Sequence, residues 1–229
     1  PVDDDHPYRS GAWRPQRTEY DAWDLEIEGE VPADLNGVYL RNTENPLFEP
    51  IRRYHPFDGD SMMHAISFEN GEARYANRFV RTDGFLAEQE AKQSLWAGIT
   101  ERPETALADH GWGARTRMKD NASTDVVVHG GVALASFYQC GELYRMDPRT
   151  LAPMGKTQWR HGNGSFFPPE GVSAHTKIDE LTGEMLFFNY GTAAPYMHYG
   201  VVSRDGELTD YVDIPLPGPR LPHDMAFTE

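Results

Sequence analysis

The chain is poor in several features that define whole classes of protein. Cysteine occurs once in 229 residues, at Cys140, so neither an intrachain disulfide nor a thiolate cluster around zinc or iron–sulfur can form. Nine histidines remain as nitrogen ligands. A metal bound by this chain would therefore be held mainly by imidazole and carboxylate groups.

Positive charge is also scarce, because 21 Lys and Arg residues face 36 Asp and Glu residues, for a net charge of -15. Such a field repels phosphate backbones and anionic lipid headgroups, which argues against nucleic acid as a partner. No apolar run approaches the roughly 18 residues that span a bilayer. The opening PVDDDHPYRS lacks the basic and apolar regions of a signal peptide, so we expect a cytoplasmic protein without a transmembrane segment.

The sequence has no repeated consensus, but turn residues recur throughout it. Short segments rich in Val, Tyr, Phe and Thr alternate with 21 glycines and 17 prolines, which is typical of an all-β protein. Five turn pairs separate apolar or alternating segments and predict tight hairpins. They are Asn70-Gly71, Gly130-Gly131, Asp147-Pro148, Thr182-Gly183 and Asp205-Gly206.

Hairpins at this spacing suit a β-propeller or a β-sandwich, and we favour the propeller. Residues 83–99 interrupt the pattern, because they are rich in Ala, Glu, Gln, Lys and Leu and contain no proline. This composition predicts a short helical insertion beside the sheets. Residues 1–229 show no domain boundary and are expected to form part of a single domain.

Two irregular segments each lead to a histidine. Residues 161–171 form a predicted long loop before His175, and the proline-rich residues 215–224 lead to His223. Both segments are expected to place their histidine at the start of a strand. The final AFTE is then expected to lie inside the second of these strands.

Five motifs, in one order along nearly the whole chain, resemble those of a known family. They are LNGVYLRNTENP (35–46), YHPFDGDSMMHAISFENGEARYANRFVRT (54–82), NASTDVVVHGG (121–131), SAHTKIDELTGEMLFF (173–188) and LPHDMAFTE (221–229). They resemble successive motifs of the carotenoid cleavage oxygenases. The resemblance implies a seven-bladed β-propeller with Fe(2+) on its axis, bound by four histidines and no directly bound carboxylate.

Carried over residue by residue, the resemblance implies that His175 in SAHTKID is the first iron ligand and His223 in LPHDMAFTE the second. The other two histidines belong to motifs that come later in the considerably longer family members. The chain therefore resembles the N-terminal half of one propeller. Its metal site would need a C-terminal half that carries two further histidine ligands.

Neutral imidazoles suit Fe(II) and leave coordination positions open for O2 beside a substrate. In the family, glutamates accept the outer ring N–H of three ligands and so fix their orientation. One of these glutamate positions reads Gln139 in VALASFYQCGELY, which brings an acceptor oxygen but no charge. An alternative alignment places Glu142 there, and we favour Gln139.

Thr124 matches a family threonine that stands near the iron and limits access to a coordination position. The alternative is an ordinary strand threonine. Lignostilbene cleavers of the family also bind a substrate phenol through a lysine and a tyrosine. Here the lysine position reads Tyr138 and the tyrosine position reads Ile99 or Thr100, so this pair is missing, although residues 85–103 resemble the stilbene and phenylpropene branch.

Aromatic residues make up 12% of the chain and could line an apolar tunnel or pack between blades. The tunnel candidates are Phe57, Phe85, Trp96, Phe137 and Tyr138. The run Asp58-Gly59-Asp60 suggests calcium, but it lacks the later bidentate glutamate of a calcium loop. We interpret it as a turn.

The sequence thus predicts an Fe(II)-dependent dioxygenase that splits a C=C bond with O2 into two carbonyl products, without catalytic residues beyond the metal site. The expected substrate is an apolar small molecule: a carotenoid, apocarotenoid, stilbenoid or phenylpropene. One alternative is a propeller that has lost catalysis and binds an apolar ligand or a partner protein. The uncharged Gln139 is the feature that supports this alternative. A calcium-dependent propeller hydrolase is a poorer alternative. Metal analysis separates the three functions: iron indicates the dioxygenase, no metal the propeller without catalysis, and calcium the hydrolase.

Overall fold

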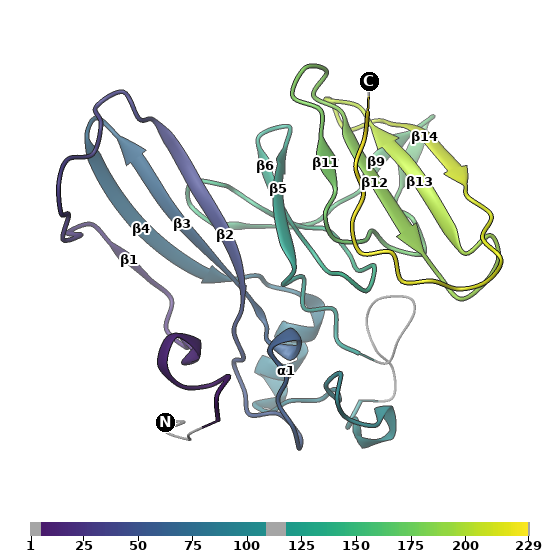
Figure 1. Cartoon of the computed structure of the whole chain (residues 1–229), viewed down its shortest axis with the longest axis horizontal. Coiled ribbons are helices and arrows are strands. Elements are labelled where there is room, and N and C mark those ends of the chain that lie inside the picture. The colour runs from purple at the N-terminus through teal and green to yellow at the C-terminus, as the bar shows by residue number, and fades with distance from the viewer. Residues whose placement is uncertain (1–5, 109–117, 229) are drawn as a thin grey trace.

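The computed structural model describes residues 6–108 and 118–228 and consists mostly of antiparallel β-sheets. Three four-stranded sheets fan out side by side, with the one α-helix of the described residues, α1 (Asp83–Ala91), below them (Figure 1). In this described part of the chain, no helix has the length and apolar character needed to cross a bilayer. The prediction of a β-rich fold with a short helical insertion is confirmed.

The sheets follow one another along the chain. The first has the order β1-β4-β3-β2, with β1 (Tyr20–Ala22), β2 (Gly37–Glu44), β3 (Ser61–Glu69) and β4 (Glu72–Phe79). The second runs β5 (Asp125–His129), β6 (Val132–Ser136), β7 (Tyr144–Met146) and β8 (Pro153–Lys156). The third runs β11 (Lys177–Ile178), β12 (Met185–Tyr190), β13 (Met197–Val202) and β14 (Leu208–Asp213). The hairpin of β9 (Trp159–His161) and β10 (Gly164–Phe166) forms a two-stranded sheet of its own, and Arg160 bridges to Glu207 just before β14. The 3-10 helices of the described residues are η1 (Gly11–Trp13), η2 (Pro56–Asp58) and η3 (Pro103–Thr105).

All five predicted turn pairs lie between neighbouring antiparallel strands. In the turn between β3 and β4, Glu69 pairs with Glu72. Asn70 and Gly71 between them take φ values of 54° and 80°, the positive φ angles that a tight two-residue hairpin requires. The hairpin predictions are therefore confirmed.

Alternating apolar residues pack each sheet against the next. One buried cluster joins Met63 of β3 to Ala133 and Ala135 of β6. A second cluster joins Leu134 of β6 to Phe187 of β12. Since successive strand residues point to opposite faces, β6 contributes one face to the contact with the first sheet and the other to the contact with the third.

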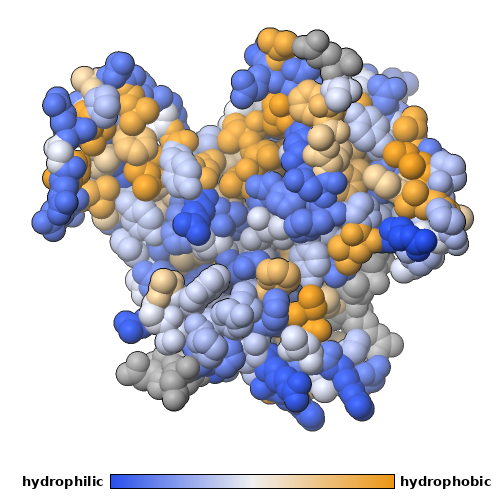
Figure 2. Space-filling view, in the orientation of Figure 1, coloured by the Kyte–Doolittle hydropathy of each residue, from blue (hydrophilic) through white to orange (hydrophobic). Residues whose placement is uncertain are grey.

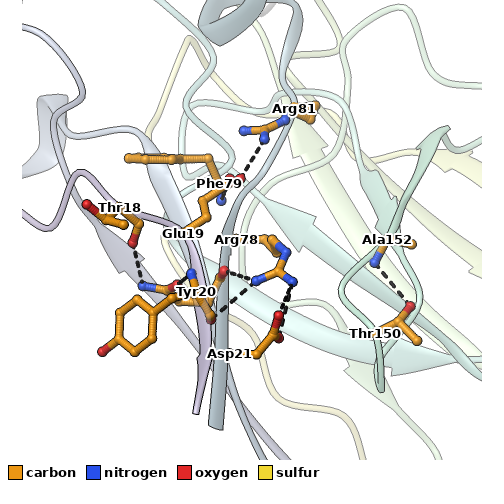
Figure 3. Close-up of polar contacts among 10 residues, drawn as sticks. Thr18, Glu19, Tyr20, Asp21, Arg78, Phe79, Arg81, Thr150 and Ala152 are labelled. Atoms are coloured by element: carbon orange, nitrogen blue, oxygen red, sulfur yellow. Dashed lines mark hydrogen bonds and ion pairs between the residues drawn. The ribbon is translucent and has the colours of Figure 1, made fainter.

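Charged side chains attach the short edge strand β1 to the first sheet (Figure 3). Arg78 donates to both carboxylate oxygens of Asp21, at 3.1 and 2.8 Å. Glu19 accepts the backbone N–H of Phe79 at 2.7 Å and a hydrogen bond from Arg81 at 2.8 Å. These two-point contacts fix the register of a strand too short to be held by its backbone alone.

The helix is shorter than predicted, since α1 ends at Ala91 rather than extending to residue 99. Lys92 takes the left-handed conformation, with φ 57° and ψ 29°, which terminates the helix. The carboxylate of Glu88 then accepts the backbone N–H of Leu95 at 2.8 Å. This tertiary contact stabilises a loop where composition alone favours a helix.

Two further expectations about loops are wrong. The segment 161–171 is not one long loop, because His161 ends β9 and residues 164–166 form β10. The segment around His223 is irregular as expected, but residues 214–228 contain no strand. Backbone hydrogen bonds from Ile214 to Met197 and from Leu216 to Pro195 hold its start, and an ion pair between Asp224 and Lys177 holds the part around His223.

Buried charges hold the connection that leads into β5. Lys119 donates to Asp60 and to Glu88 at 2.7 Å each, and all three side chains are buried. Burial by itself lowers the pKa of Lys119, but the two carboxylates outweigh it and raise this pKa. The cation therefore ties the first sheet and α1 to the segment that precedes β5.

Asp120 makes a second attachment in the same segment. Its carboxylate accepts the backbone N–H of Ala122 at 3.0 Å and that of Glu142 at 2.8 Å. Burial raises the pKa of Asp120 to about 7, against the lowering effect of these hydrogen bonds, and the nearby charges of Glu142 and Asp83 add to the rise. Near neutral pH, much of this carboxyl group therefore carries a proton in the folded protein.

We expect the free energy of unfolding to fall as the pH rises from about 4 to about 7. The pKa of Asp120 is about 7 in the folded state against an ordinary value of 3.8, so between these values the folded state keeps a proton that the unfolded state has lost. Glu44 acts in the same direction, because burial and Asp58 raise its pKa to about 7. Urea denaturation at several pH values should show a flatter pH dependence in Asp120→Asn and an unchanged one in Asp210→Asn, on the exposed side of β14. Equal slopes in both variants would contradict a protonated Asp120.

Candidate metal centre

His175 lies two residues before β11 in a tightly constrained backbone. A bridge between Gly141 and Val172 anchors the preceding residues to the second sheet. Gly171 approaches this sheet so closely that a Cβ there would lie 2.5 Å from the carbonyl oxygen of Cys140. His175 takes a φ of 62°, which is uncommon for a residue other than glycine and is concentrated at functional sites.

The segment after β14 brings His223 to the same place. Residues 214–228 cross the third sheet and turn upward beside β11 (Figure 1). On one side of His223, the Asp224 carboxylate forms a 2.6 Å ion pair with Lys177 of β11. Met225 packs against a buried cluster that includes residues of β12. These contacts fix the histidine from its C-terminal side.

The two imidazoles meet edge to face. Their Nε2 atoms are 3.3 Å apart, their ring centroids 4.8 Å apart and their planes at 84°. Behind the His175 ring, Nδ1 lies 2.8 Å from a carboxylate oxygen of Asp125. The structure thus places His175 and His223 together, with a carboxylate on the far side of the first ring.

This arrangement fits a shared metal ion. The Asp125 carboxylate accepts the Nδ1–H of His175, which leaves the Nε2 lone pair directed toward His223. Two imidazole nitrogens that bind one ion at about 2.1 Å, with an angle of roughly 90–110° between them, lie about 3.0–3.4 Å apart. The separation of 3.3 Å falls within this range.

The pair supplies only part of a coordination shell. Across residues 6–108 and 118–228, no group of three or more His, Cys, Asp or Glu side chains is arranged to hold a metal ion. A metal at this point would therefore take its further ligands from outside the described residues.

Asp125 is the site residue that sequence reasoning missed. It is the first residue of β5 and directly follows Thr124, but its partner lies 50 residues later in the chain. The available signal was a carboxylate at a strand start, beside a threonine expected near the metal. The hairpin pattern contains no information on which side chain faces His175.

The candidate at the glutamate position lies elsewhere. Among the hydrogen bonds of the described residues, none joins Gln139 to His175 or to His223, and the Gln139 side chain interacts with Tyr138. Glu142 of the alternative alignment faces Lys156 at 3.8 Å. The charge behind His175 therefore comes from Asp125 and from neither aligned position.

The structure shows the ordinary strand contact of Thr124, and its role near the metal stays a prediction. Its hydroxyl oxygen accepts the backbone N–H of Tyr138 at 3.1 Å, as an ordinary strand threonine would. It also lines a cavity of about 670 Å³. Most of the other residues that line this cavity are polar, among them Arg41, Glu44 and Ser123.

Three of the five tunnel candidates form an aromatic row that ends beside His175. Phe57 is 45% exposed, and its ring centroid lies 5.7 Å from that of Tyr138. The ring centroids of Tyr138 and Phe137 are 4.9 Å apart. Both pack with Ala174, the residue before His175. The row thus runs from the exposed Phe57 to the residue before His175, and its role as a substrate tunnel stays a prediction.

The other two candidates point elsewhere. Phe85 is fully buried in a core cluster with Met62 and Phe79. Trp96 lines a separate cavity of about 40 Å³ that Lys119 also lines. Neither side chain belongs to the aromatic row.

Other residues occupy the two positions at which family members carry the phenol-binding lysine and tyrosine. Burial raises the pKa of Tyr138 against the lowering effect of Gln139, and the charges of Asp58 and Glu44 add to the rise, so its hydroxyl stays protonated. Ile99 is 39% exposed and donates its backbone N–H to Asp58 at 2.8 Å. Thr100 is exposed next to it. None of these groups offers a cation to a phenolate.

Comparison with known proteins covers nearly the whole chain. The family described as retinal pigment epithelial membrane protein matches residues 13–229. Isoeugenol monooxygenase of Pseudomonas nitroreducens is 34% identical over 226 residues, which are 97% of this chain and 45% of that protein. The chain therefore spans less than half the length of this relative.

Solved structures give the same picture. The lignostilbene dioxygenase of Pseudomonas brassicacearum superposes with a TM-score of 0.81 at 29% identity, over 98% of this chain and 46% of that one. A cobalt-substituted apocarotenoid oxygenase of Synechocystis superposes with a TM-score of 0.75 at 28% identity, over 93% and 46% of the two chains. Cobalt substitution implies a metal centre in that relative.

We expect Asp125→Asn to weaken Co²⁺ binding by the complete protein about 10-fold or more, because carboxylates behind ligating histidines typically contribute 10–100-fold to metal affinity. The variant keeps an acceptor for His175 but removes the charge. Asp210→Asn, on exposed β14, makes the same charge change away from the site and serves as the control. Competition with a chromophoric chelator measures both affinities. Equal affinities in the two variants would show that Asp125 does not support the ligand.

Proposed function

Because this chain belongs to the carotenoid oxygenase family, we propose that it supplies two of the iron ligands of an Fe(II)-dependent dioxygenase. The enzyme cleaves a C=C bond with O2 into two carbonyl products. The observation that carries the proposal is the pair of facing Nε2 atoms of His175 and His223, backed by Asp125. The named relatives are oxygenases that act on isoeugenol, lignostilbenes or apocarotenoids.

His175 and His223 would hold the ferrous ion, and the bound ion supplies the position at which O2 meets the alkene. The chain's own groups then act by holding and orienting. Asp125 keeps the proton on Nδ1 of His175, so Nε2 remains available as a ligand. The Lys177–Asp224 ion pair keeps His223 opposite it. No acid, base or nucleophile of the protein is required for this chemistry.

The aromatic row supports a neutral, conjugated substrate. Phe57, Tyr138 and Phe137 lie in contact from the surface to the residue beside His175, and flat rings bind conjugated molecules by stacking and by excluding water. The Tyr138 hydroxyl is protonated and is the only polar group that these three side chains present. Stilbenoids, phenylpropenes and apocarotenoids all fit this description, and none needs to bind as a phenolate.

The rest of the site would come from a C-terminal half that completes a seven-bladed propeller and carries two further histidines. Two observations support this part of the proposal. The described residues offer the metal only two histidines. Figure 2 shows a notch between the first sheet and the rest of the molecule with hydrophobic residues on its flanks. Propeller blades normally cover such faces by packing on one another.

A second function remains worth testing because of Gln139. If the uncharged residue at this position has cost the protein its iron, the propeller would bind an apolar ligand or a partner protein without catalysis. The Asp125 carboxylate favours the first function, because it places a charge behind a ligand despite Gln139.

We expect the complete protein to bind one ferrous ion and to cleave at least one alkene in a panel of phenylpropenes, stilbenes and apocarotenals. Chelation should abolish cleavage, and Fe(II) but not Zn(II) should restore it, since zinc has no redox chemistry with O2. Because Tyr138 is neutral, 4-methoxylated stilbenes should react within about 10-fold of 4-hydroxylated ones, the effect of a single modest contact. Mass spectrometry of the carbonyl products measures the outcome. Strict dependence on a free phenol would refute this reading of Tyr138, and an iron-free, inactive protein would favour the second function.

Residues 1–229 on their own should hold no stoichiometric iron and should cleave nothing. Two imidazoles bind ferrous iron much less firmly than four on one scaffold, since each added ligand raises the local concentration for the next. Uncovered blade faces also invite aggregation. Iron content and alkene cleavage should be measured for this segment alone and again with the downstream half supplied. Full activity from the segment alone would contradict the four-histidine site.

A further inference from the structure

A single amide of the first sheet contacts the segment that carries Asp125. Nδ2 of Asn42, in β2, donates to the carbonyl oxygen of Ala122 at 2.7 Å and to that of Asp125 at 3.0 Å. These acceptors lie 80 and 83 residues later in the chain. Both hydrogens of one amide group are therefore used to hold the start of β5.

The orientation of this amide is fixed from behind by Ser61. The Ser61 hydroxyl donates to Oδ1 of Asn42 at 2.6 Å, and Ser61 is 1% exposed. The backbone N–H of Ser61 also donates to the carbonyl oxygen of Asn121 at 3.3 Å. An amide with its oxygen and nitrogen exchanged would lose both hydrogen bonds to the carbonyls of Ala122 and Asp125, because Oδ1 cannot donate to them.

The segment needs such an external support because its backbone is bent. Ala122 is fully buried and takes a φ of 47°, which is unusual for alanine. Asp120 satisfies the N–H of Ala122 on one side of the bend, and Asn42 satisfies its carbonyl on the other. β2 and β5 belong to different sheets, so no backbone ladder between them makes these contacts.

Asp125 links Asn42 to His175. Asp125 accepts from Asn42 through its backbone oxygen and from His175 Nδ1 through its side chain, at 3.0 and 2.8 Å. A hydrogen bond at 2.8 Å is lost when its partner moves by about 1 Å. Any shift of the start of β5 therefore changes the direction of the imidazole that faces His223.

We propose that Asn42 is a positioning residue for the candidate metal centre. Ser61, Asn42, Asp125, His175 and His223 form one continuous hydrogen-bonded series, and the first sheet sets the direction of Nε2 of His175 through it. This inference rests on the proposed function for the identity of the bound group. The geometry of the Asp125–His175 contact does not depend on that function.

The test compares two asparagines of the same sheet in the complete protein. Asn42→Asp keeps the shape and the acceptor for Ser61 but replaces the double donor with an oxygen that repels the two carbonyls. Asn77→Asp is the matched control. Asn77 is buried and Asn42 is half-buried. Asn77 accepts the N–H of Tyr20 at 2.8 Å and donates to the carbonyl of Thr18 at 3.3 Å, away from the segment that carries Asp125. Ser61→Ala is a milder variant in the same series.

Three measurements separate positioning from general stability. Thermal unfolding should show losses in both asparagine variants. Only Asn42→Asp should lower Co²⁺ affinity, by about 10-fold or more, and change the visible d–d spectrum of the bound cobalt. In the metal-free protein, NMR should show the downfield Nδ1–H proton of His175, assigned by its absence in His175→Gln. This signal should be lost in Asn42→Asp and kept in Asn77→Asp.

Each outcome bears on the proposal. A folded Asn42→Asp protein with the affinity, cobalt spectrum and Nδ1–H signal of the wild type would overturn it. If Asn42→Asp does not fold, Ser61→Ala decides the question, with a smaller loss of affinity and a weaker Nδ1–H signal expected and an unchanged site overturning the proposal. A wild type that binds no cobalt but shows the Nδ1–H signal, lost only in Asn42→Asp, would refute the proposed function and support the positioning role.

Discussion

The hydrogen bond from His175 Nδ1 to the Asp125 carboxylate is the contact around which this part of the molecule is organised. It selects the nitrogen of His175 that remains free, and so decides what the ring can bind. Its acceptor begins β5 of the second sheet and its donor lies just before β11 of the third. Both ends are fixed independently. On the His175 side, the left-handed backbone and the close approach of Gly171 leave little freedom. On the Asp125 side, the bent segment after Asp120 is held by buried polar groups.

Apolar and polar residues have separate tasks in this architecture. The faces of the strands bury apolar side chains, as β6 does toward both of its neighbouring sheets, and this packing supplies most of the stability. Polar side chains gather where strands begin and where segments change sheets. There the backbone groups have no ladder partner, so side chains such as Asp120 and Asn42 satisfy them. Because a hydrogen bond is directional and apolar packing is not, the polar contacts set the orientation of the site.

The sequence carried the local features well and the long-range ones poorly. Turn pairs such as Asn70-Gly71 specify positive φ angles within two residues, so the hairpins followed from the residues alone. His175 and His223 followed from motifs, and their meeting in space agrees with a shared site. The end of α1 could not be predicted, since it depends on Glu88 accepting from Leu95 after the helix has turned. The role of Asp125 could not be predicted for the same reason, because its partner His175 is 50 residues away. The hairpin of β9 and β10 was missed because Gly162 and Asn163 were assigned to a long loop.

The large sequence separations within the site have a kinetic consequence. Asp125 and His175 lie 50 residues apart, and His175 and His223 lie 48 residues apart. Contacts that close long loops form late in folding, after local hairpins. The two imidazoles can therefore face each other only once the second and third sheets have docked and the segment after β14 has crossed back over them. A chain in which these sheets have not yet docked therefore has no pair of facing imidazoles.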